Sequence, residues 1–189
     1  MTLIALTTAG SVDEDLVAFV ETCIALSLGV TTKRLPPMPH PDYAWDAVRQ
    51  QYNSPLIMRE ALRLRPPDAA KLLVLTECDL FIPMLSFVYG QAQLDGAVAV
   101  LSLARLRQEY YGLPQNRPLF LMRIRKELLH ELGHTAGLTH CDDRIYTMAL
   151  STNIQQLDAK GNDFCEGCSV LLREHIADAG LRATPGETT

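Results

Sequence analysis

The sequence predicts a mixed α/β fold of the α+β type, in which a mixed twisted sheet is backed by helices and followed by a small C-terminal lobe. Apolar runs of strand length alternate with helical patterns through much of the chain. Asp95-Gly96 separates two strand-like runs and is a hairpin-type turn signal. After His140 the chain becomes polar and turn-rich. Its 189 residues fit one domain, which we expect to divide into an N-terminal lobe of residues 1–138 and a C-terminal lobe of residues 139–189.

The N-terminal half supplies most of the predicted strands, and Gly, Pro and Asp residues separate its elements. The run KLLVLT at residues 71–76 is the clearest buried strand. In chain order we expect a strand at 3–7, a helix from Ser11 or Asp13 to about Leu28 that Gly29 ends, a strand at 30–35, a proline-rich loop, helices at 43–52 and 55–64, the strand at 71–76, and a hairpin of strands 87–92 and 97–103.

A longer helix is predicted from about Pro118, which suits a first helical turn, through His134. It would bury one side in the core and turn His130 and His134 toward a cleft. The apolar residues opposite these histidines are Leu121, Ile124, Leu128 and Leu132. A last amphipathic helix runs to about Leu181, before a tail at 183–189 that we expect to be frayed.

The bulk composition argues against several classes of protein. Hydrophobic residues make up 48% of the chain, and the formal net charge is -5 with no basic tract, so we expect no nucleic-acid partner. No apolar run reaches the ~18–20 residues that a membrane span needs. The N-terminal stretch lacks the basic start and long apolar run of a secretory signal. We therefore expect a cytoplasmic monomer whose thiols stay reduced.

Residues 130–140, HELGHTAGLTH, are the most informative stretch. His130 and His134 are four residues apart, so on a helix their imidazoles share one face and can bind one Zn²⁺ at about 2.0–2.1 Å. Glu131 lies roughly 100° further round, where a general base for a zinc-activated water belongs. Gly137 can end the helix in a left-handed conformation and bring back His140 as a third ligand. Three protein ligands leave one position open, as in a catalytic zinc site.

The alternative interpretation is a helix that carries surface histidines. A solvated face would need neither Gly137 nor His140 at these spacings, so the zinc interpretation is favoured. The remaining histidines, His40 and His175, are expected at surface or capping positions.

The five cysteines, an odd number, favour metal binding or burial over a disulfide framework. Cys141 directly follows the third histidine, and Cys165 and Cys168 form a CxxC pair. These three could bind a metal. Alternatively, the CxxC pair could cap the last helix in reduced form, or it could serve redox chemistry. Cys23 and Cys78 lie in apolar surroundings and are expected to be buried, inert thiols.

This pattern of histidines and cysteines resembles that of the archaemetzincins, a branch of the metzincin zinc peptidases. The resemblance covers residues 130–168, and the matching residues are His130, Glu131, His134, Gly137, His140, Cys141, Met148, Cys165 and Cys168. It implies a metzincin-like fold with an active-site helix, a catalytic zinc on the three histidines, and Glu131 as base and acid. It also implies that Met148 is the Met-turn methionine beneath the metal.

In the family, four cysteines bind a second, structural zinc. Here Tyr146 stands where the second cysteine is expected, and the interval from Met148 to Cys165 is one residue shorter than in the family. A closed zinc site has four ligands, and a tyrosine is a poor one. The second site is therefore completed by another ligand, weakened or lost. The candidates for its fourth ligand are Asp142, Asp143, His175 and a water.

Together these features predict a zinc-dependent metallopeptidase acting on a peptide substrate. The resemblance also implies a cleft-edge strand that pairs with an extended substrate, and residues 97–103 are our candidate. Tyr110, Tyr111 and Tyr146 are candidates for stabilising the oxyanion. The competing hypotheses are a non-proteolytic zinc-binding protein, which uses its metal for stability or partner binding, and a zinc-dependent hydrolase of another amide.

Overall fold

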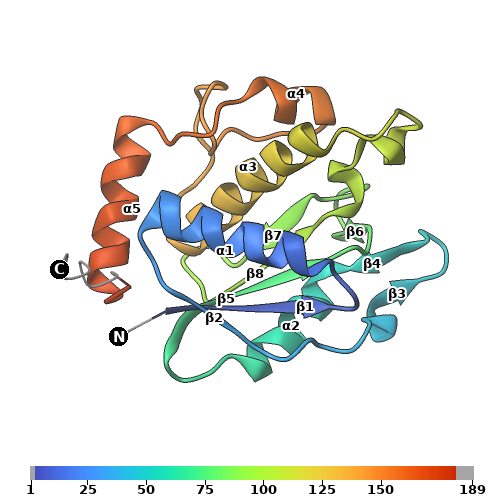
Figure 1. Ribbon diagram of the computed structural model, residues 1–189, viewed down its shortest axis with the longest axis horizontal. Helices are drawn as coiled ribbons and strands as arrows, with labels where there is room; N and C mark the ends of the chain where they lie inside the picture. The colour runs from blue at the N-terminus through green and yellow to red at the C-terminus, as the bar shows by residue number, and fades with distance from the viewer. Residues whose placement is uncertain (1–2, 182–189) are drawn as a thin grey trace.

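The computed structural model describes residues 3–181, and its centre is a five-stranded sheet with helices on both faces (Figure 1). The expected frayed tail at 183–189 lies outside the described residues. In chain order the elements are β1 (Leu3–Ala9), α1 (Glu14–Leu28), β2 (Thr32–Arg34), η1 (Asp42–Ala44), β3 (Trp45–Asp46), β4 (Gln51–Asn53), α2 (Ser54–Leu64), β5 (Ala69–Thr76), β6 (Leu80–Phe81), β7 (Gly90–Ala92), β8 (Val98–Ser102), η2 (Ala104–Leu106), η3 (Gln108–Tyr111), α3 (Arg117–Thr135), α4 (Ile154–Ala159) and α5 (Glu166–Asp178).

The main sheet is mixed, as the sequence predicts. Its strand order is β2-β1-β5-β8-β7. The first four of these strands run parallel to their neighbours, and β7 runs antiparallel to β8 in the expected hairpin. A second, three-stranded sheet has the order β3-β4-β6. The hairpin places β7 at one edge of the main sheet, beside the long helix α3.

Alternate residues of the central strands enter two separate apolar layers, as the period of two requires. In β5, for example, Leu73 and Leu75 join a cluster with α1, α3 and α5, whereas Leu72 and Val74 join a cluster with α2. Figure 1 shows α1 and α3 on one face of the sheet and α2 on the other. The expected burial of Cys23 and Cys78 is confirmed, one in each cluster.

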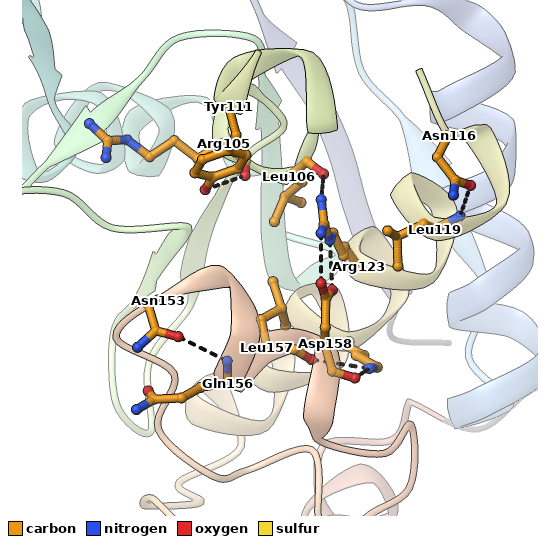
Figure 2. Close-up of polar contacts among 11 residues, drawn as sticks. Arg105, Leu106, Tyr111, Asn116, Leu119, Arg123, Asn153, Gln156, Leu157 and Asp158 are labelled. Atoms are coloured by element: carbon orange, nitrogen blue, oxygen red, sulfur yellow. Dashed lines mark hydrogen bonds and ion pairs between the residues drawn. The ribbon is translucent and has the colours of Figure 1, made fainter. Parts of the chain in front are cut away.

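Helix α3 confirms the helix predicted from Pro118, and its start follows from the sequence. The Asn116 side chain accepts a hydrogen bond from the Leu119 backbone N–H, and Pro118 lies in the first turn (Figure 2). The helix packs against the sheet on one side, while the chain that follows it covers the other. The predicted apolar stripe is buried at Ile124, Leu128 and Leu132.

Charged residues join α3 to the C-terminal part of the chain. The Arg123 guanidinium donates to both carboxylate oxygens of Asp158 on α4, each at 2.7 Å, and to the Leu106 carbonyl at 2.9 Å (Figure 2). One turn further along α3, the Lys126 ammonium donates to the carbonyls of Leu157 and Asp158. These bonds hold α4 across the outer side of α3.

The helix predicted at residues 43–52 is wrong. The segment forms η1, then β3, a turn and β4. The Asp46 side chain accepts hydrogen bonds from the backbone N–H groups of Val48 and Arg49, which favours a turn over a helix. Gln50 has a positive φ of 55°, so the chain reverses and β4 pairs with β3.

The choice of residues 97–103 as the cleft-edge strand is also wrong. This segment contains β8, which lies between β5 and β7 and has all five of its residues buried. The edge strand is β7, whose three residues are only partly buried. Strand propensity identified both strands of the hairpin but not which of them lies at the edge, because that depends on the pairing of β8 with β5.

Within residues 3–181, none of the helices combines the length and apolar character required to cross a bilayer.

We predict that Asp158→Ala lowers the free energy of unfolding by about 2 kcal/mol, because it leaves the Arg123 guanidinium, 3% exposed, without its partner. The expected loss lies between those of exposed and fully buried ion pairs, since the Asp158 side chain is 33% exposed. Urea denaturation measures it. Asp68→Ala is the matched control, because its pair with Lys33 is exposed on both sides. Equal stability of the two variants would contradict the prediction.

Candidate active site

The end of α3 and the loop after it bring the three histidines of the motif together. His130 and His134 project from α3, and Gly137, with a φ of +83°, turns the chain so that His140 returns beside them. The Nε2 atoms of His130 and His134 are 3.1 Å apart. The ring centroid of His140 lies 5.3 Å from that of His130 and 4.9 Å from that of His134. One ring nitrogen from each of the three lies within 4.8 Å of the others.

Two of these rings are oriented by backbone carbonyls. The Nδ1 atom of His130 lies 2.9 Å from the Thr147 carbonyl oxygen, and Nδ1 of His134 lies 2.7 Å from that of Leu138. Because a carbonyl only accepts, each Nδ1 carries the proton and each Nε2 presents a lone pair. Two nitrogens bound to a tetrahedral zinc at about 2.05 Å are about 3.3 Å apart. The observed spacing and tautomers therefore fit a zinc ion.

Burial keeps the three imidazoles neutral. It lowers the pKa of His130 to about 4, and it lowers the pKa values of His134 and His140 as well. Because only an unprotonated nitrogen can bind a metal, these directions favour metal binding at neutral pH.

Glu131 lies at the base of a cavity of about 330 Å³ that the three histidines also line. Burial, and then the neighbouring Glu127 carboxylate, raise the pKa of Glu131 well above its usual range. A carboxylate in this state accepts a proton readily, as a general base must. The lining of the cavity also includes the apolar side chains of Ile82, Leu85, Phe87 and Leu150.

Met148 is fully buried beneath α3. A Cβ atom built on Gly133 would lie 2.5 Å from the Met148 Sδ atom, so the methionine packs against the backbone of α3 between the positions of His130 and His134. The Thr147 carbonyl that orients His130 belongs to the preceding residue. The assignment of Met148 as the Met-turn methionine stays a prediction.

A buried ion pair lies one turn before the histidines on α3. The Lys160 Nζ atom donates to the Glu127 carboxylate at 2.9 Å and to the Ala149 carbonyl at 3.3 Å. The two side chains are 1% and 5% exposed. Since Glu127 also lines the cavity, this pair connects α3, the segment after Met148 and the end of α4 directly behind the site.

Another buried lysine fixes the C-terminal end of α3. The Lys71 Nζ atom, on β5, donates to the carbonyls of Thr135 and Gly96 at 2.6 and 2.8 Å. The Asp95 backbone N–H donates to the His134 carbonyl at 2.9 Å. The turn between β7 and β8 is therefore bonded to the end of the helix that carries the histidines.

The three cysteines also converge. One sulfur from each of Cys141, Cys165 and Cys168 lies within 4.8 Å of the others. Cys165 precedes α5, and the Cys168 backbone N–H donates to its sulfur at 3.4 Å, which lowers the pKa of the Cys165 thiol. Burial raises the pKa of Cys168 to about 12. The Cys141 backbone N–H donates to the Met148 carbonyl, so the cysteine cluster adjoins the segment beneath the histidines.

The side chains suggested as the fourth metal ligand do not lie beside the three cysteines. Asp142 and Asp143 are exposed, and His175 is half-buried near Lys71, seven residues beyond Cys168 along α5. Over the stretch that the structure describes, no fourth His, Cys, Asp or Glu joins the three sulfurs within 4.8 Å. The cluster thus contains three thiols, as the replacement of the second cysteine by Tyr146 implies.

The tyrosine that lies at the cavity differs from those proposed to stabilise the oxyanion. None of Tyr110, Tyr111 and Tyr146 is among the described residues that line the cavity, whereas Tyr89 is. In the part of the chain described, the buried Tyr89 hydroxyl has no hydrogen-bond partner. The sequence analysis missed Tyr89, Glu127 and Lys160. Of these, only Glu127 carried a usable signal, because it lies four residues before Glu131 on the same helical face.

Three convergent neutral imidazoles beside a buried glutamate are the set of side chains that a hydrolytic metal site of the zinc-peptidase type requires. The sequence profile described as peptidase family M54 matches residues 68–174. Similar proteins include an archaemetzincin of Methanocaldococcus jannaschii, 36% identical over 165 residues, or 87% of this chain and 89% of that protein. An archaemetzincin of Methanopyrus kandleri is 40% identical over 74% of this chain and 76% of that protein.

Solved structures agree with these sequence relationships. The crystal structure of an archaemetzincin from Methanopyrus kandleri matches with a TM-score of 0.80 and 34% identity, covering 93% of this chain and 96% of that one. A zinc-dependent peptidase from Methanocorpusculum labreanum also has a TM-score of 0.80, with 30% identity over 89% of this chain and 99% of that one. The chain belongs to peptidase family M54 and is a zinc metallopeptidase. The resemblance to archaemetzincins and the mixed α/β fold class are confirmed.

We predict that Lys160→Met lowers the free energy of unfolding by about 3–5 kcal/mol, because the Glu127 carboxylate is left buried without its partner. The double variant Glu127→Leu with Lys160→Met should recover much of this loss, since it removes both charges. Chemical denaturation of the three proteins measures the difference. A single variant as stable as the parent would contradict the assigned ion pair.

Proposed function

We propose that His130, His134 and His140 bind the catalytic zinc and that Glu131 is the general base for hydrolysis of a peptide bond. One observation carries the proposal: imidazole nitrogens with free lone pairs converge beside a buried carboxylate in one cavity. The peptidase names of the relatives support it at the level of the reaction class.

Zinc bound by these residues would supply Lewis acidity to the substrate carbonyl and to the attacking water. Glu131 accepts a proton from that water as its oxygen attacks the carbonyl carbon. Glu131 then donates the same proton to the leaving nitrogen as the C–N bond breaks. Its raised pKa suits both steps, because the group must take up a proton and release it in one turnover.

The substrate is proposed to pair with β7. Gly90, Gln91 and Ala92 all line the cavity, and β8 occupies only one side of this strand. An extended peptide can therefore add to the free side and place a backbone carbonyl beside the histidines. Strand β7 takes the role that the sequence analysis gave to residues 97–103.

We also propose a second, structural zinc at Cys141, Cys165 and Cys168, with a water as fourth ligand. The three sulfurs are close enough to share one ion, and they join the start of α5 to the residue after His140. Such a site would fix a C-terminal segment whose own apolar core is small.

We predict that Glu131→Gln retains zinc but lowers kcat by at least about 10²-fold, because the variant has no base. His134→Ala should instead lose the catalytic metal. Elemental analysis gives the zinc content, and cleavage of a peptide library gives the activity. Full activity of the Glu131→Gln variant would show that Glu131 is not the general base. A zinc-loaded parent that cleaves no peptide, and that unfolds when chelated, would support the non-proteolytic alternative.

We predict two zinc ions per chain in the purified protein and one in Cys165→Ser, since two thiolates and a water make a weak site. Cys23→Ser is the control, because Cys23 is a buried cysteine that belongs to neither of the two groups of candidate metal ligands. Zinc-to-protein ratios and thiol titration measure the outcome. A parent with one zinc and freely titratable Cys141, Cys165 and Cys168 would exclude the second site.

A further inference from the structure

The Glu131 side chain lies directly against the backbone of Gly90, the first residue of β7. A Cβ atom added to Gly90 would lie 2.6 Å from both the Cγ and Oε1 atoms of Glu131 and 2.8 Å from its Cδ atom. Protein side chains do not approach this closely. Any residue other than glycine at position 90 must therefore displace either Glu131 or the strand.

The backbone conformation does not itself require glycine at position 90. Gly90 is not among the residues with positive φ, unlike Gly137, so an alanine would meet no conformational strain there. The Glu131 side chain, and not the backbone conformation, is thus what a side chain at position 90 would meet.

The strand is less free to move than the glutamate. Gly90 is paired with Leu101 of β8, and the Ser102 backbone N–H donates to the carbonyl of the preceding residue, Tyr89, at 2.8 Å. Tyr89 is itself buried and packs edge-on against Phe87. Helix α3 is equally fixed, since hydrogen bonds hold it at Arg123 and at its last residue, Thr135, and it is buried along most of its length. The side chain of Glu131 can rotate at a smaller cost than either backbone can shift.

We propose that Gly90 is a positioning residue of the peptidase: the absence of a side chain on the edge strand keeps the Glu131 carboxylate in its catalytic rotamer. This rests on the proposed role of Glu131 as general base. A Cβ atom at position 90 would push the carboxylate away from β7, while His130, His134 and His140, which are not among the nearest atoms to that Cβ, would keep their places.

The first test compares Gly90→Ala with the parent. We expect kcat to fall by about 10²-fold, the effect of displacing a catalytic group by about 1 Å, with a smaller change in KM and an unchanged zinc content. Gly29→Ala, at the end of α1, is the control for a general loss of stability, because a Cβ atom there meets nothing within 4 Å and only the positive φ of +64° opposes the substitution. It should retain the parental kcat. An active parent with an equally active Gly90→Ala variant would overturn the proposal and leave the proposed function intact.

The second test does not depend on activity. Gly90→Ala should lower the melting temperature of the parent, but it should have little effect in a Glu131→Ala background, where the space for the new methyl group is open. A crystal structure of Gly90→Ala should show the Glu131 carboxylate in a different rotamer and β7 in place. If the two substitutions lower the melting temperature additively, or if Glu131 keeps its rotamer, the proposal is wrong even when the parent proves to be a peptidase.

Discussion

The site depends on the hydrogen bonds between two imidazole Nδ1 atoms and the backbone carbonyls of Thr147 and Leu138. These bonds fix the tautomers and direct the Nε2 lone pairs of His130 and His134 toward one point. Both carbonyls belong to the chain that follows α3. The helix supplies the ligands, but the later segment orients them, so neither part could form the site alone. Met148 belongs to that segment, and its contact with Gly133 fixes how closely the segment packs under the helix.

Buried charged side chains lie next to this arrangement, on α3 and just after α4. Glu127 and Glu131 are two carboxylates one helical turn apart, and Lys160 pairs with only the first of them. Glu131 is therefore the carboxylate that does not pair with Lys160, and burial raises its pKa. Lys160 also bonds the Ala149 carbonyl, so the same ammonium group neutralises one acid and anchors the segment that orients His130.

Much of the candidate site could be predicted because its ligands are local in sequence. The spacing of His130 and His134, the helix around them and the turn at Gly137 depend on a single stretch of chain. The edge strand could not be chosen in this way, since which strand of the hairpin lies at the edge depends on the pairing of β8 with the distant strand β5. The sequence also carried no signal for the contacts that Lys160, Gly90 and Lys71 make with α3, because each of these residues comes from a distant part of the chain. The helix expected at 43–52 failed where the Asp46 side chain favours a turn. The division of the chain into two lobes at residue 138 stays a prediction.

The bond network around Lys71 has a consequence for how the chain can vary in length. Its ammonium joins the central strand β5 to the hairpin turn and to the last turn of α3, and Asp95 adds a main-chain bond to His134. An insertion between β7 and β8 would lift Gly96 away from this junction and loosen the helix end. Among the described residues, no hydrogen bond joins the exposed loop at residues 142–145 to α3. Homologous chains should therefore accommodate extra residues in that loop far more readily than in the two-strand turn.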